Sequence, residues 1–195
     1  MNLLGTPLSA VVAAFLFAGS SPDETNVARW QQSLSDARDI SAEAAEAAAS
    51  GNTEEAVRLY EDAMIFGRKA AVALHERGVV GDASDSDLSV DDESPLDWLI
   101  GIFRDSALMR IQLDDIDGAR KDAWGACLYS QNADIASLEC LAKVCEAGGD
   151  DMGRLMALKN ILQLDDTAKD DKKLDSKGRR GIESAVRHLE TKLKA

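Results

Sequence analysis

Hydrophobic and polar positions alternate with a helical period along most of the chain after residue 22. In residues 37–49 small apolar side chains recur every three or four positions, and residues 53–74 repeat this spacing with larger ones. Apolar residues at this spacing share one face of an α-helix. Only Ser50-Gly51-Asn52 separates the two runs. The pattern therefore predicts two amphipathic helices packed antiparallel as a helical hairpin, with Asn52 and Glu55 forming a capping box.

Further patterns of the same period predict the remaining helices. One covers 95–113 and begins at a Ser-Pro-Leu-Asp sequence, which is typical of a helix start. Three more follow between residues 117 and 166, and a last helix is expected at 182–194 after a charged linker at 167–181. No segment has the alternation of a strand. The chain is therefore predicted to be all-α, with a helical domain over 23–166.

The second helix of the hairpin carries a small, aromatic, small pattern at Ala56, Tyr60 and Ala63, with Gly51 at the preceding turn. In this it resembles the tetratricopeptide repeat (TPR) family. Two further copies are offset by 63 and 35 residues, with Ala119 and Arg154 at the place of Ala56. In them Ala123 and Leu158 stand at the aromatic place, and Trp124 lies one step along. The resemblance implies a short right-handed α-solenoid of about three TPR-like units, ending in a C-terminal capping helix.

This resemblance implies a non-catalytic scaffold or adaptor that mediates protein–protein interaction. The first helices of stacked hairpins line a concave groove that binds a peptide or helix of a protein partner. The candidate partner-binding residues on these helices are Arg38, Arg104, Lys143 and Glu146. Ser41 and Ala45 occupy the places where some relatives carry a clamp for chaperone C-terminal carboxylates. We therefore expect no binding of chaperone tails.

A second resemblance covers residues 37–74, where GN-x-EEA-x-x-LY is similar to the microtubule-interacting-and-trafficking (MIT) domain. It implies a three-helix trafficking adaptor in which residues 37–113 alone fold and bind an amphipathic helix. The helices at repeat spacing beyond residue 113 favour the longer solenoid.

The first 22 residues have no charged side chain, and Leu3 to Ala18 are mostly apolar. This segment is short for a membrane span, which needs roughly 20 residues. Three interpretations stay open for it: a signal-peptide core, a membrane anchor, or a packed terminal helix. An anchor would associate the chain with a membrane, and a packed helix would suit a structural subunit of a larger assembly.

Charge is distributed unevenly along the chain, whose formal net charge is −13. Residues 1–168 hold 13 Lys and Arg against 30 Asp and Glu, whereas residues 169–195 hold nine against five. The acidic body argues against nucleic acid as a partner, since affinity for phosphates rests on basic residues. Residues 78–94 contain six acids and no base and are predicted to be an acidic loop.

Chemistry-bearing motifs are missing from the sequence. Cys127, Cys140 and Cys145 fall in predicted helices, where free cysteine behaves as a small buried hydrophobe, and they favour a reducing compartment. The two histidines lie far from them, so no metal site is expected. No phosphate loop, nucleophile elbow or dinucleotide turn is present. We expect no catalytic residue, no cofactor and no enzymatic activity.

Overall fold

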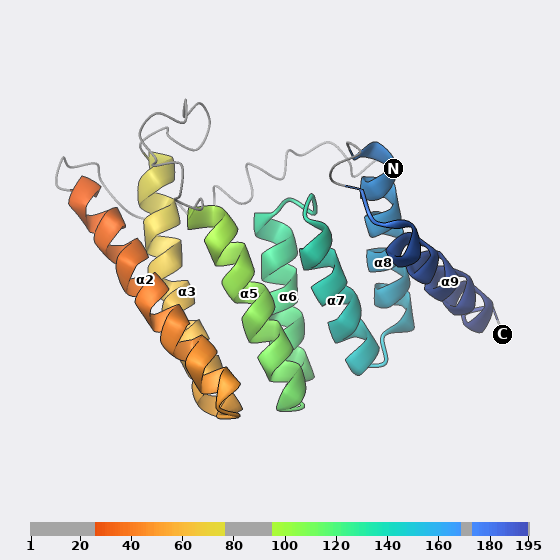
Figure 1. Cartoon of the computed structure of the whole chain (residues 1–195), viewed down its shortest axis with the longest axis horizontal. Helices are drawn as coiled ribbons and strands as arrows, with labels where there is room; N and C mark the ends of the chain where they lie inside the picture. Colours follow the sequence, from red (N-terminus) through yellow and green to blue (C-terminus); the bar gives the residue numbers. More distant parts are fainter. Residues whose placement is uncertain (1–25, 77–94, 169–172, 195) are drawn as a thin grey trace, which may run out of the picture. The chain divides into compact units, whose positions relative to one another are not determined.

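The computed structural model of the chain describes residues 26–76, 95–168 and 173–194, and these form seven helices and no strand (Figure 1). The helices are α2 (Asn26–Ala49), α3 (Thr53–Glu76), α5 (Pro95–Gln112), α6 (Ile116–Tyr129), α7 (Ile135–Ala147), α8 (Asp151–Thr167) and α9 (Ser176–Lys192). The all-α prediction is confirmed for this part of the chain. The apolar segment 3–18 and the acidic loop 78–94 lie outside the described residues. No described helix has the length and apolar character needed to cross a membrane.

Two compact units divide the chain, residues 1–103 and residues 104–195, with the boundary inside α5. The helical domain predicted over 23–166 did not anticipate this division. Each unit has buried apolar side chains of its own, and each is described separately below.

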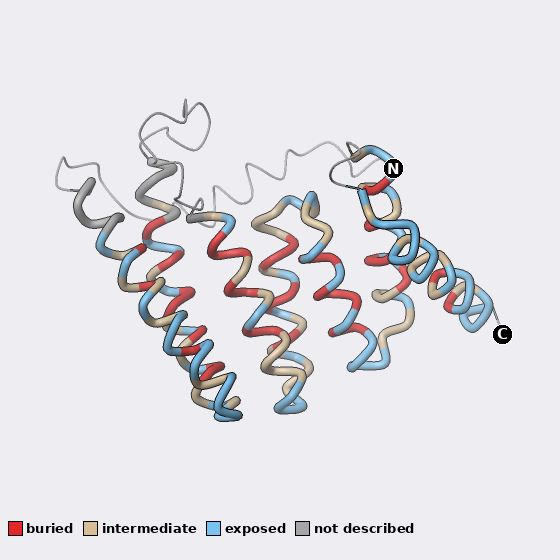
Figure 2. Tube along the Cα trace, viewed as in Figure 1, coloured by how far each residue is buried: buried red, intermediate tan, exposed pale blue. Residues whose placement is uncertain are grey.

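In the first unit, α2 and α3 pack along their length as the predicted antiparallel hairpin. Ala37, Ala44, Ala56 and Ala63 are completely buried between them, and Tyr60 is 4 % exposed. Figure 2 shows buried positions recurring along α3. Small side chains at the crossing let the two backbones approach closely, and the single large ring fills the remaining space.

The first half of α5 packs closely on α3 at Gly67. A Cβ atom at this position would lie 2.6 Å from Cζ3 of Trp98 and 3.1 Å from Cδ1 of Leu99. Both of these side chains are buried. Glycine is therefore required here because the Trp98 ring occupies the space of a side chain.

Four helix ends share one turn geometry, the Schellman motif. At the ends of α2, α5, α6 and α7 the amide three residues past the helix donates to a carbonyl five residues back, over 2.8 to 2.9 Å. The residue before that amide has a positive φ: Gly51, Asp114, Gln131 and Gly149. Gly51, Asp114 and Gly149 are separated by the same 63 and 35 positions as the sequence copies. Three of the helix pairs are thus joined by equivalent three-residue turns.

The predicted capping box at the start of α3 does not form. The backbone N–H of Asn52 donates to the carbonyl of Ala47, 2.9 Å away, because it completes the Schellman turn. The carboxylate of Glu55 instead binds Arg58 one turn further along α3. The Asn52 amide therefore stabilises the turn after α2 and is not available to the Glu55 side chain.

In the second unit, the residues from Arg104 of α5 through α9 enclose one apolar core. Its completely or almost completely buried members include Ala107, Ala123, Leu138, Val144, Ile161 and Leu189. The helices α6, α7, α8 and α9 begin at aspartates whose carboxylates accept backbone N–H bonds: Asp115, Asp134, Asp150 and Asp175. Aspartate is favourable there because it satisfies free amides and complements the helix dipole.

The last helix begins earlier than the sequence suggested, at Ser176 rather than at 182, so residues 176–181 are not linker. Asp165 of α8, which is 1 % exposed, explains the difference. Its carboxylate accepts from the backbone N–H of Leu174 over 2.6 Å and from Nη1 of Arg179 over 2.5 Å. These bonds fix the first turn of α9 against α8, which the charged composition of the segment had concealed.

Candidate protein-interaction surface on α5 and α7

Arg104 in the second half of α5 contacts both the start and the middle of α7 in the second unit. Nη1 of Arg104 on α5 is 2.9 Å from Oδ2 of Asp134, the residue that precedes α7. The thiol of Cys140 on α7 donates to the backbone carbonyl of Arg104 over 3.7 Å. These two contacts, both made by Arg104, join α5 to α7. We call the exposed surface of residues 104–112 and 135–147 the α5/α7 face.

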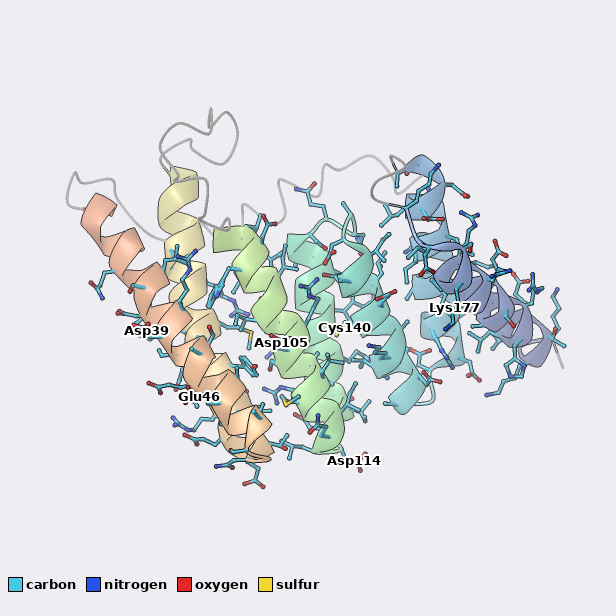
Figure 3. All side chains as sticks on the ribbon, in the orientation of Figure 1. Asp39, Glu46, Asp105, Asp114, Cys140 and Lys177 are labelled. Carbon is cyan, nitrogen blue, oxygen red and sulfur yellow. The ribbon has the colours of Figure 1, made fainter. Side chains whose placement is uncertain are left out.

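Exposed charges of both signs lie on this face. Asp105 of α5 and Glu139 and Lys143 of α7 are exposed, whereas Cys140 is 4 % exposed and lies beneath them. Figure 3 labels Asp105 and Cys140 on their two helices. Glu139 and Lys143 are one helical turn apart, so they share a side of α7. The face therefore presents separate negative and positive groups on a rigid helical support.

The pKa of the Cys140 thiol reports how these charges surround it. Burial raises this pKa to about 11, while Lys143 and Arg104 act to lower it and Asp105 acts to raise it. The pKa of Asp105 is also raised, because neighbouring protein atoms partly desolvate its carboxylate. The positive charge of Arg104 acts in the opposite direction and lowers this pKa. The α5/α7 face is an electrostatically mixed surface with an inert thiol beneath it.

Arg104 has a positioning role in this arrangement. Its partner Asp134 also accepts the backbone N–H groups of Ala136 and Ser137 and the hydroxyl of Ser137. The Arg104 guanidinium therefore completes the N-terminal cap of α7 and holds this helix against α5. The sequence predicted Arg104 as a partner contact, and the structure adds its ion pair with Asp134 at the start of α7.

The remaining two predicted site residues have other surroundings. Oε1 of Glu146 is 2.7 Å from Nη1 of Arg154 on α8, so this exposed carboxylate is engaged within its own hairpin. Arg38 is half-buried on α2, in the first unit. Of the four candidates, Arg104, Lys143 and Glu146 lie in the second unit, and Arg38 lies in the first.

A buried polar network lies behind the α5/α7 face and was missed by sequence reasoning. The hydroxyl of Ser106, which is completely buried, donates to Oδ2 of Asp122 on α6 over 2.7 Å. Nε of Arg110 donates to the same oxygen over 2.8 Å, and its Nη1 binds Asp115. The sequence signal that could have revealed this network was Asp122, an acidic residue on the side of α6 that is otherwise apolar and buried. This network fixes α6 to α5.

The described residues offer no metal centre, since no group of three His, Cys, Asp or Glu side chains comes together among them. Burial raises the pKa of the Cys127 thiol to about 12, so this thiol also stays protonated near neutral pH. Compared with family models, curated proteins and solved structures, the chain matches none of them.

Proposed function

We propose that the chain is a non-catalytic scaffold, similar in principle to TPR proteins, that binds a peptide or helix of a protein partner along the α5/α7 face. The observation that supports this most is the direct contact between α5 and α7. Two first helices held side by side form a rigid surface, and interaction surfaces on rigid elements bind without a large ordering cost. The rigidity comes from Arg104 and from the buried Asp122 network.

The charges of the face define the chemistry of the peptide. Asp105 and Glu139 favour a Lys or Arg side chain, and Lys143 favours an Asp or Glu. A peptide that carries both signs at a spacing of one or two helical turns fits this arrangement. A strongly acidic peptide does not, because Asp105 and Glu139 repel it. The expected absence of chaperone-tail binding agrees with this chemistry.

Selection of peptides from a random library on the immobilised full chain tests the proposal. Peptides recovered should carry mixed charge, and Lys143→Glu should weaken their binding about tenfold or more, as expected for loss of a charge pair and gain of a repulsion. Lys121→Glu is the matched control, because Lys121 is an exposed lysine of α6 outside the face. Failure to recover binders, or equal weakening by the two variants, would overturn the proposal.

A second candidate function, a subunit of a larger assembly, is favoured by one further observation. Trp124 of α6 and Met152 and Met156 of α8 are 56 %, 54 % and 61 % exposed. Large exposed apolar side chains are frequent at protein interfaces. Hydrogen exchange and Trp124 fluorescence of the native complex would show protection of α6 and α8 if these side chains are covered there.

A further inference from the structure

The solvent-facing side of α9 carries only basic and neutral residues, in contrast to the acidic chain. Lys177, Arg180 and Arg187 are exposed and, at about 100° per residue, fall within about 80° of arc on the helix. His188 is exposed beside them. We call this surface the basic face of α9. Among the described residues no carboxylate forms an ion pair with these three side chains.

The other sides of α9 are already occupied. Val186 and Leu189 are buried in the core of the second unit. The acids of the helix are used within the molecule, since Glu183 binds Arg179 and Glu190 binds Lys159 of α8. Because the apolar side is packed inside, α9 cannot insert that side into a lipid surface as an amphipathic membrane helix does. A protein of opposite charge is the occupant that suits the basic face.

The chain itself contains a complementary surface on α2. Asp39, Glu43 and Glu46 are exposed, and with the half-buried Asp36 they fall within about 80° of arc. No described ion pair involves them. We call this the acidic face of α2. Figure 3 labels Asp39 and Glu46 on α2, and Lys177 on α9.

The spacing of charges on the two faces matches. Asp39 and Glu46 are seven residues apart, and so are Arg180 and Arg187. At about 1.5 Å per residue both intervals measure about 10 Å along the helix. The match holds for parallel and for antiparallel helices, and two pairs can therefore form at once in either orientation.

From this complementarity we infer that the chain self-associates, with the basic face of α9 in one copy binding the acidic face of α2 in a second copy. Different surfaces of the two copies meet, so the contact is heterologous. Exposed ion pairs contribute little individually, and the association is therefore weak and reversible. It takes place at an ionic strength of about 0.1 M, where the Debye length of about 10 Å screens the repulsion between net negative copies but not charges in contact. The inference does not depend on the proposed peptide binding.

Analytical ultracentrifugation of the full chain tests this inference. At about 0.1 M salt the weight-average mass should rise with concentration from about 10 µM to 1 mM, and at about 0.5 M salt the rise should disappear. Arg180→Glu with Arg187→Glu should weaken association about tenfold or more, as should Asp39→Lys with Glu46→Lys. Lys69→Glu with Lys121→Glu changes net charge as much as the α9 variant but alters exposed lysines outside the basic face. This control should retain association to within about twofold.

Mixing the two reversed variants is the decisive step. In each variant alone, the two faces carry charge of the same sign. In the mixture, each face of one variant meets a face of opposite charge on the other variant, so association should return on mixing. A chain that stays monomeric throughout, or association that survives both reversals, would overturn the inference. So would a compaction that is independent of concentration and lost on reversal, since it would show the two faces meeting within one copy. Association with an added poly-glutamate peptide but not with a second copy would assign the basic face to a foreign acidic partner and would also refute self-association.

Discussion

Removal of the Asp122 carboxylate is the substitution that most directly tests how the α5/α7 face is held. In Asp122→Ala, the hydroxyl of Ser106 and Nε of Arg110 both lose the oxygen to which they donate over 2.7 and 2.8 Å. Ser106 is completely buried and Asp122 is 6 % exposed. Water therefore cannot replace the lost acceptor without opening the contact between α5 and α6.

The expected cost follows from these contacts. A buried hydroxyl left without a partner costs about 1–3 kcal/mol. Arg110 keeps its ion pair with Asp115, so loss of the ion pair with Asp122 adds about 1 kcal/mol. We therefore expect Asp122→Ala to lower the free energy of unfolding of the second unit by about 3 kcal/mol, a large part of the 5–15 kcal/mol typical of a domain.

Hydrogen exchange of amides in α5 and α6, with urea unfolding followed by circular dichroism, measures this loss locally. Lys121→Ala on the same helix is the matched control and should stay within about 0.5 kcal/mol of the parent chain. Ser106→Ala should cost about 1 kcal/mol, and the double variant should cost less than the sum of the two. A loss below about 1 kcal/mol for Asp122→Ala, or strict additivity with Ser106→Ala, would refute the reasoning.

Three further outcomes are expected from the same structure. Gly67→Val should lower the free energy of unfolding of the first unit by about 1–3 kcal/mol, because its side chain overlaps the Trp98 ring, and thermal melting checks this. The thiols of Cys127 and Cys140, whose raised pKa values are about 12 and 11, should resist iodoacetamide at pH 8 until urea is added. Since unfolded thiols ionise near pH 8.5, stability should fall as the pH rises above that value. Asp165 has a lowered pKa because Leu174 and Arg179 bind its carboxylate; its stabilising effect is present above about pH 4 and lost as the pH falls through the lowered pKa, which proteolysis of α9 in an acid titration detects.

The helical period and the turn residues account for what the sequence predicted well. Helix α5 was expected at 95–113 and is observed at Pro95–Gln112, because its start and its apolar face agree. The burial of Ala56, Tyr60 and Ala63 was likewise predicted from local spacing. Patterns that concern one helix at a time are readable because each residue's role depends on its own helix face.

Roles that depend on a second helix were not readable in this way. The bond of Arg104 to Asp134 at the start of α7 was not predicted, because this aspartate lies thirty positions along the chain. The early start of α9 was missed for the same reason, since the bonds that hold Leu174 and Arg179, on either side of this start, come from Asp165 on another helix. The structural roles of Arg104 and Asp165 therefore depend on partners that another part of the fold supplies.

The distribution of counter-charges also distinguishes the arginines that stabilise the second unit from the basic residues that we propose as contacts. Arg104, Arg110 and Arg179 each find carboxylates within the second unit and stabilise it. By contrast, Lys143 on the α5/α7 face, like Arg180 and Arg187 on α9, forms no ion pair with any described residue. Lys121, an exposed lysine of α6, forms no ion pair with a described residue either, so a missing counter-charge does not by itself mark a binding site. Lys143, Arg180 and Arg187 are proposed contacts because of the faces on which they lie. Reversing such residues should therefore change binding and leave the melting temperature unchanged, whereas reversing Arg104 or Arg179 should lower it.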